Sequence, residues 1–221
     1  MVYFISGLGA DERIFQFLDL ANIEHRHIKW IIPLRDEVLT TYCKRLIEQI
    51  DLTERVVLIG VSFGGIIAQE ISKLIRVERV IIISSVKKSS EFSMSLRILR
   101  KLQIHKFTPY WLMRIGNKYT ADYYFSTQTQ KESKLLHQII DDTDPHFLVW
   151  AIDRIMNWEN DSYPSNLVHI HGTRDRIFPI KNIENAIEIA NGGHFMMVNK
   201  SGEVERLIFA LINSTINEHT E

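Results

Sequence analysis

A serine flanked by glycines is the residue of this 221-residue chain whose surroundings most clearly suggest chemistry. The segment Gly60-Val61-Ser62-Phe63-Gly64 has the form G-x-S-x-G, and it lies between the apolar run Val56–Ile59 and a stretch with helical spacing. A sharp turn from strand to helix leaves little room two residues before and after the serine, so it requires glycine at both places. Such a turn strains the serine backbone and exposes the hydroxyl. The pattern predicts a nucleophile at Ser62, and the simpler alternative is that Ser62 caps the helix.

Two more polar side chains follow apolar runs nearer the C-terminus. Asp175 lies in a loop after Leu167–Ile170, and His194 follows Gly192-Gly193 after the run Ile187–Ala190. In open α/β sheets, the loops after the carboxyl ends of the strands are where active sites form. Taken alone, Asp175 is more often a turn former and His194 more often a surface or core residue. Their common position after strands nevertheless makes both candidates for catalysis.

The elements that must position these side chains alternate between apolar runs and helical spacing. Continuous apolar strands argue for a parallel sheet covered by helices on both faces, with right-handed crossovers. We therefore predict an α/β fold, a three-layer αβα sandwich with a mostly parallel sheet of about six strands. The expected strands are Val2–Ile5, Ile28–Ile32, Arg55–Gly60, Val80–Ile83, Leu167–Ile170 and Ile187–Ala190. The expected helices outside the central region are Asp11–Leu20, Val38–Ile50, Ile66–Ile75 and Val204–Ile216, with a short helix around Lys181–Ala186.

Residues 87–164 interrupt the alternation, because they contain no clean β run. Helical stretches are expected there at Met94–Lys106, Trp111–Lys118, Lys131–Asp141 and His146–Glu159. The chain length fits one domain, so we predict a single domain over residues 1–221 with a helical cap insertion at about 87–164. Asp153 lies in this insertion and Asp161 precedes the next strand, which makes both weaker candidates than Asp175 for a catalytic acid.

The order of the three candidate residues along the chain narrows the possibilities. Ser62, Asp175 and His194 each follow a separate expected strand, in the order Ser, Asp, His. This is the order of α/β-hydrolases and not of chymotrypsin-like or subtilisin-like enzymes. Over nearly its whole length the sequence resembles a small member of the α/β-hydrolase superfamily. The resemblance implies that Ser62 is the nucleophile, that His194 is the base, and that Asp175 orients the imidazole. Gly60 and Gly64 would be the glycines of the nucleophile elbow.

The resemblance also implies an oxyanion hole made of two backbone N–H groups. One belongs to Phe63, the residue after the nucleophile, and the other to Leu8 in the loop Ser6-Gly7-Leu8-Gly9. Members of the superfamily often have His-Gly where this chain has Ser6-Gly7, a change that a backbone donor can tolerate. By this resemblance Val2–Ile5 would be the third strand of the superfamily, so we expect the first two strands to be absent, a change that should affect only a sheet edge.

The function implied by this resemblance is hydrolysis of a carboxylic ester or thioester of a small to medium acyl substrate. The reaction would proceed through an acyl-enzyme and would need no metal or organic cofactor. Hydroxynitrile lyases, C–C bond hydrolases and cofactor-free haloperoxidases, including perhydrolases, resemble the chain in the same way, and the sequence does not separate them. Haloalkane dehalogenases are excluded, because they require Asp at position 62. A non-catalytic ligand receptor is a further alternative, although a receptor need not keep all three residues.

Composition excludes several other classes of protein. The 26 Lys and Arg residues against 27 Asp and Glu residues give no overall attraction to nucleic acid. A lone Cys43 excludes an intrachain disulfide, a zinc ribbon and an iron–sulfur site. No apolar run approaches 18 residues and the first residues do not have the pattern of a signal peptide. We therefore expect no transmembrane segment and a cytoplasmic location.

The cap region suggests two further features. Its segment Val86–Lys118 is strongly basic and is either the solvated face of a cap helix, a dock for an acidic carrier protein or anionic substrate, or a weak contact with an anionic membrane. Its basic residues are Lys87, Lys88, Arg97, Arg100, Lys101, Lys106, Arg114 and Lys118, against Glu91 alone. Aromatic residues either line an acyl pocket or pack the cap onto the sheet. They are Tyr119, Tyr123, Tyr124, Phe125, Trp150 and Trp158.

Overall fold

A single parallel sheet organises the chain in a computed structural model that describes residues 1–103 and 120–217, with side chains as far as residue 214. In these residues the sheet has six strands in the order β2-β1-β3-β4-β5-β6, and every neighbouring pair is parallel. The strands are β1 (Val2–Ile5), β2 (His25–Ile28), β3 (Val57–Val61), β4 (Arg79–Ile83), β5 (Leu167–Gly172) and β6 (Ile187–Ile189). Parallel pairing places the carboxyl ends of all these strands at one edge of the sheet.

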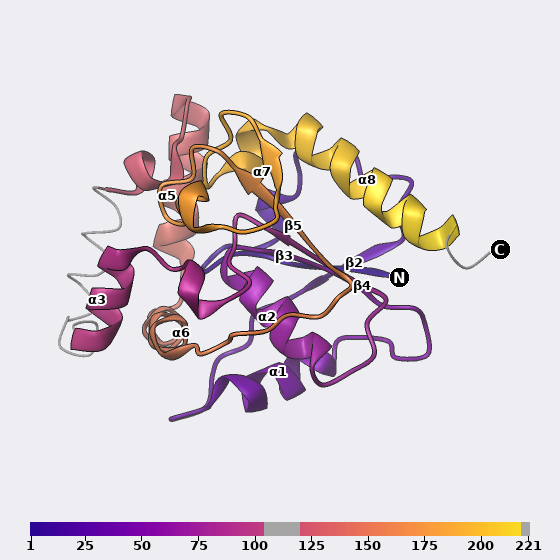
Figure 1. Ribbon diagram of the computed structural model, residues 1–221, viewed down its shortest axis with the longest axis horizontal. Helices are drawn as coiled ribbons and strands as arrows, with labels where there is room; N and C mark the ends of the chain where they lie inside the picture. The colour runs from indigo at the N-terminus through magenta and orange to yellow at the C-terminus, as the bar shows by residue number, and fades with distance from the viewer. Residues whose placement is uncertain (104–119, 218–221) are drawn as a thin grey trace.

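Helices cover both faces of the sheet, which gives the three layers expected from the sequence (Figure 1). On one face, α1 (Leu39–Ile47), α2 (Phe63–Ser72) and α6 (Pro145–Asn157) enclose a core with strand residues such as Tyr3 and Ile5. On the other face, α5 (Gln130–Asp142), α7 (Met196–Asn199) and α8 (Ser201–Asn217) pack on residues such as Phe4. All four residues of β1 are buried, because alternate side chains enter the two cores.

The chain between β4 and β5 is helical in the part that the structure describes. It contains η2 (Ser89–Glu91), α3 (Met94–Leu102), α5 and α6, and no strand among residues 84–103 and 120–166. The expected helix Trp111–Lys118 lies outside the described residues, as do Lys106, Arg114 and Tyr119. No helix within residues 1–103 and 120–217 is both long enough and apolar enough to cross a membrane.

Five expected strands lie within two residues of their predicted bounds, but the second does not. β2 covers His25–Ile28, whereas the apolar pattern predicted Ile28–Ile32. Two side chains occupy the backbone groups that a longer strand would need for pairing. The side chain of Gln49, just after α1, hydrogen-bonds both the N–H and the C=O of Lys29, and the Tyr42 hydroxyl of α1 hydrogen-bonds the same two groups of Ile31. As the edge strand, β2 needs only its backbone pairing with β1 and can be polar.

Two expected helices are much shorter in the structure. Of the predicted helix Asp11–Leu20, only η1 (Glu12–Ile14) forms, because the turns that follow close i to i+3 bonds rather than α-helical ones. Near Lys181–Ala186 only η4 (Ile180–Asn182) forms. There the backbone at Glu184 instead contacts a buried ion pair, accepting from the Lys87 ammonium and donating to Glu91.

Candidate active site

Ser62 occupies the turn between β3 and α2 in a backbone conformation that few residues adopt. Its φ of 53° and ψ of −118° lie outside the regions favoured by L-residues, which is the strain expected of a nucleophile elbow. A Cβ on Gly60 would overlap the Gly64 carbonyl, and a Cβ on Gly64 would overlap the carbonyl oxygens of Ile5 and Ser6. Both glycines are therefore sterically required. The Ser62 side chain makes no capping bond to the helix, so the simpler alternative for this residue is wrong.

The Ser62 hydroxyl instead faces His194. The distance from Ser62 Oγ to His194 Nε2 is 3.0 Å, a hydrogen bond in which the hydroxyl donates when that nitrogen is unprotonated. His194 lies in the loop between β6 and α7, past the carboxyl end of its strand, as predicted. The rings of Phe125 and Phe178 contact the imidazole edgewise, with centroid distances of 5.2 Å and 5.6 Å. These contacts leave the imidazole little freedom to turn.

The Asp175 carboxylate completes a line of hydrogen bonds. Its Oδ2 lies 2.8 Å from His194 Nδ1, and its Oδ1 accepts the backbone N–H groups of Ile177 and Phe178 at 2.8 Å and 2.9 Å. Burial by itself would raise the pKa of Asp175, but the charge and hydrogen bond of His194 outweigh it, aided by His171 and the Phe178 N–H. The pKa of Asp175 is therefore lowered, and the group is an anion at neutral pH.

Two buried histidines of β5, His169 and His171, lie next to this carboxylate, and sequence reasoning did not single them out. His171 Nε2 donates to the Phe178 carbonyl at 2.7 Å and lies 3.7 Å from Asp175 Oδ2. Its Nδ1 therefore accepts, and His169 Nε2 donates to it at 3.1 Å. Burial lowers the pKa of both histidines. The available signal was their i, i+2 spacing within a buried strand, which places both on one face.

The loop after β1 passes close to the nucleophile. A Cβ built on Gly7 would lie only 3.4 Å from Ser62 Cβ, so the predicted oxyanion loop borders the elbow. Within the described residues, the N–H of Leu8 donates no hydrogen bond. Phe63 is the first residue of α2, and the first N–H of a helix has no acceptor within that helix. Two backbone donors thus remain available beside Ser62.

The two weaker acid candidates do not join this arrangement. Asp153 lies on α6, where it pairs with Arg154 and accepts a bond from Asn157. Asp161 is exposed, in the segment that precedes β5. No group of three or more His, Cys, Asp and Glu side chains in residues 1–103 and 120–217 could hold a metal ion.

The predicted aromatic cluster divides between two roles. Trp150 and Trp158 are buried, and their indoles donate to the Glu37 carbonyl and the Glu70 carboxylate, so they fasten the insertion to the helical layer of α1 and α2. Phe125 contacts the imidazole described above, whereas Tyr123 and Tyr124 are exposed. The structure thus gives the packing role to both tryptophans.

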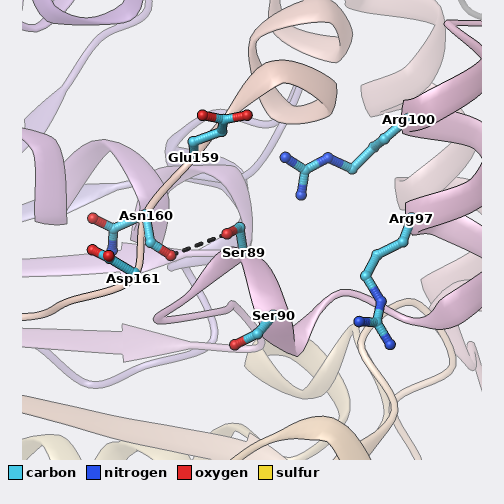
Figure 2. A pocket seen from close by; sticks show the side chains of 7 residues that line it. All are labelled: Ser89, Ser90, Arg97, Arg100, Glu159, Asn160 and Asp161. Atoms are coloured by element: carbon cyan, nitrogen blue, oxygen red, sulfur yellow. Dashed lines mark hydrogen bonds between the residues drawn. The ribbon is translucent and has the colours of Figure 1, made fainter.

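A cavity of about 540 Å³ lies between α3 and the chain that follows α6 (Figure 2), and none of the three candidate residues lines it. Arg97 and Arg100 project from α3 toward it, opposite the Ser89 and Ser90 hydroxyls and the segment Glu159–Asp161. The Arg100 guanidinium donates to two backbone carbonyls of α6 and its end, and it stacks on the Phe92 ring.

The expected basic dock is therefore partly internal. Lys87 is 1% exposed and is held by the backbone at Glu184, beside Glu91. Lys88 pairs with the Glu184 carboxylate. Together with Arg100, these are three cations of the predicted dock that already have partners within the chain. The described residues therefore give no support to the expected binding of an acidic carrier protein.

Comparison with known proteins agrees with the fold. A model of the alpha/beta hydrolase family matches residues 2–207. A thermophilic esterase from Thermogutta terrifontis, solved with malate bound, superposes with a TM-score of 0.70 at 16% identity, covering 97% of this chain and 89% of that one. An esterase from Exiguobacterium antarcticum gives 0.67 at 16% identity, with 96% and 91% covered. A bromoperoxidase from Bacillus anthracis gives 0.67 at 17% identity, with 96% and 91% covered. Among curated proteins, none matches the sequence significantly.

Proposed function

The chain belongs to the α/β-hydrolase family, and we propose that it is a serine hydrolase that cleaves a carboxylic ester or thioester of a small to medium acyl substrate. The observation that carries the proposal is the unbroken line from Ser62 Oγ through the imidazole of His194 to Asp175, with contacts of 3.0 Å and 2.8 Å. The similarity in fold to esterases supports the choice of an ester bond.

In the proposed mechanism Ser62 Oγ attacks the carbonyl carbon while its proton passes to His194 Nε2. The buried anion of Asp175 stabilises the imidazolium that forms, and it keeps Nδ1 protonated so that Nε2 can act as the base. When the tetrahedral intermediate collapses, the carbon–oxygen or carbon–sulfur bond breaks, and Nε2 returns the proton to the departing alkoxide or thiolate. Water then repeats the sequence on the acyl-enzyme and releases the carboxylic acid.

The negative charge on the carbonyl oxygen would be stabilised by the backbone N–H groups of Phe63 and Leu8. The loop of Gly7 and the start of α2 border Ser62 from two sides, which supports this choice of donors. A preorganised donor of this kind stabilises the transition state by about 3–4 kcal/mol. The N-terminal end of α2 adds a favourable dipole for the same charge.

A second candidate keeps the three residues and changes the attacking molecule. In perhydrolysis, hydrogen peroxide rather than water attacks the acyl-enzyme, and the product is a peracid. The similarity in fold to a bromoperoxidase is the observation that favours it. Adding peroxide to the ester assay and titrating peracid separates the two reactions.

The decisive experiment is intact-mass detection of a fluorophosphonate adduct. We expect one adduct on the wild-type protein, none on Ser62→Ala, and an unchanged adduct on Ser90→Ala, which alters an exposed serine. Ester and thioester panels of graded acyl length then define the substrate. A folded wild-type protein without adduct, or an adduct that persists in Ser62→Ala, would contradict the proposed nucleophile. An adduct without hydrolysis of any ester or thioester would contradict the proposed bond.

A further inference from the structure

The loop that carries the Leu8 N–H is closed by an indole from another part of the chain. Trp30 Nε1 donates to the Ala10 carbonyl at 2.9 Å and to the Gly7 carbonyl at 3.2 Å. The Gly7 carbonyl also accepts the Ala10 N–H at 3.0 Å, and the Ala10 carbonyl accepts the hydroxyl of buried Ser6 at 2.6 Å. One indole N–H thus joins both ends of a turn that two further hydrogen bonds also close.

The Gly7 carbonyl determines where the Leu8 N–H points. The two groups belong to one planar trans peptide, in which the carbonyl and the N–H point in opposite directions. Holding the Gly7 oxygen toward Trp30 therefore turns the Leu8 N–H away from Trp30. A flip of this peptide would break the bond from the indole and would remove the Leu8 donor from the hole.

The indole is itself held in place by the elbow and the insertion. Its ring stacks on Phe63 with a centroid distance of 5.6 Å and an interplanar angle of 26°, and it packs on Phe147 of α6 at 5.1 Å. Trp30 lies two residues past the end of β2, where the chain has already left the sheet. Its position therefore depends on the same residue, Phe63, whose N–H is the second proposed donor.

We propose that Trp30 is a positioning residue that holds the Gly7–Leu8 peptide in the orientation that serves the oxyanion. The proposal rests on the proposed serine hydrolase function, since it concerns the hole of that same site. In this role Trp30 acts through the carbonyl of Gly7. An indole N–H donates only and does not titrate, so the orientation is kept at every pH at which the enzyme works.

The test compares two phenylalanine variants of indole donors. Trp30→Phe keeps a ring between Phe63 and Phe147 and removes the N–H. Trp150→Phe is the matched control, because its buried indole packs in the same aromatic cluster and donates at 2.7 Å to the Glu37 carbonyl, far along the chain from the loop. For each variant, kcat/KM is measured with the best ester of the panel, together with the melting temperature.

Two inhibitors that resemble this ester distinguish a loss of oxyanion positioning from a general loss of structure. A trifluoromethyl ketone forms a bond from its carbonyl carbon to Ser62 Oγ and places an oxyanion in the hole, whereas the corresponding alcohol does not. In Trp30→Phe we expect about a tenfold loss in kcat/KM and in ketone affinity, since misplaced groups cost this much or more. Alcohol affinity should stay unchanged, and Trp150→Phe should bind both inhibitors as the wild type does.

Ser6→Ala provides a second route if Trp30→Phe does not fold. This variant removes the hydrogen bond from the Ser6 hydroxyl to the Ala10 carbonyl, at the other end of the turn. It should lower the affinity for the ketone and leave the affinity for the alcohol unchanged. Equal ketone affinity in wild type and in every folded variant of Trp30 and Ser6 would overturn the proposal, as would an equal loss in Trp150→Phe. Wild-type protein that binds neither fluorophosphonate nor ketone would instead contradict the proposed function itself.

Discussion

His194 Nδ1 lies 2.8 Å from Asp175 Oδ2, and the two side chains are only 3% and 0% exposed. A buried carboxylate needs its oxygens satisfied, and here two backbone N–H groups of the following turn bond Oδ1 while the imidazole bonds Oδ2. This arrangement turns Nδ1 of the imidazole, and not Nε2, toward the carboxylate, so Nε2 of the neutral ring is free to accept from Ser62. The tautomer of His194 therefore depends on one side chain.

Replacing that side chain by asparagine tests the dependence. In Asp175→Asn the amide oxygen can still accept the Ile177 and Phe178 N–H groups, so the fold should persist, but the amide N–H would face Nδ1 and favour the wrong tautomer. We expect kcat to fall by about 10⁴ with little change in melting temperature. Asp161→Asn, which alters an exposed carboxylate, is the control and should keep full activity. Ester hydrolysis by Asp175→Asn within tenfold of wild type would remove Asp175 from the mechanism.

The elbow glycine nearest the oxyanion loop gives a prediction about stability. A methyl group in Gly64→Ala would overlap the backbone carbonyls of Ile5 and Ser6, which cannot rotate away as a side chain would. We expect a loss of about 3 kcal/mol in the free energy of unfolding, measured by urea titration. Gly202→Ala is the matched control, since a methyl group there meets nothing within 4 Å. It lies in α8 and should leave stability unchanged or raise it by up to about 1 kcal/mol. Equal effects in both variants would contradict the steric account.

The buried strands and the elbow could be predicted because their requirements are local. A parallel strand covered on both faces must be apolar where it is buried, as β3 and the last four residues of β4 are, and a strand-to-helix turn must have glycine where Gly60 and Gly64 lie. The structure brings Ser62, Asp175 and His194 into hydrogen-bonding range, as loops after parallel strands favour. Their catalytic role stays a prediction until the variants are measured.

The features that the sequence did not reveal depend on contacts between distant segments. β2 lies at the edge of the sheet, where pairing with β1 needs no apolar run, so the pattern favoured the residues just after it. Trp30 hydrogen-bonds a loop that precedes it by 20 or more residues, and His169 hydrogen-bonds its neighbour His171. Polar side chains within an apolar run do not disclose such partners, because any of several tertiary neighbours would satisfy the same donor.

The two histidines of β5 predict how stability depends on pH. Burial lowers the pKa of His169 well below its ordinary 6.5, with help from His171 and Lys87. The unfolded chain therefore takes up this proton first as the pH falls, so stability is complete above about pH 6.5 and decreases below it. Each such proton contributes a slope of about 1.4 kcal/mol per pH unit. We expect the free energy of unfolding, from urea titrations at pH 7.5 and 5.5, to be lower at the acidic pH.

His169→Gln should reduce that difference, because the amide still donates to His171 Nδ1 but does not titrate. His146→Gln, at an exposed histidine of α6, should leave the difference as in the wild type. The same dependence on pH in all three proteins would mean that the acid sensitivity arises elsewhere.

The loop that carries His194 packs against residues 125 and 126 of the insertion, and one substitution can disrupt this contact while a second can restore it. A Cβ on Gly193 would overlap the side chain of Ser126, while Phe195 N–H donates to the Phe125 carbonyl at 3.0 Å. Gly193→Ala should therefore push the imidazole away from Ser62 and lower kcat by at least about tenfold. Adding Ser126→Gly removes the obstructing side chain and should restore most of the activity. Ser126 has φ of 59°, and its buried hydroxyl has no partner in the described residues, so Ser126→Gly alone should also raise stability by about 1 kcal/mol. A double variant as slow as Gly193→Ala would show that the insertion does not position His194.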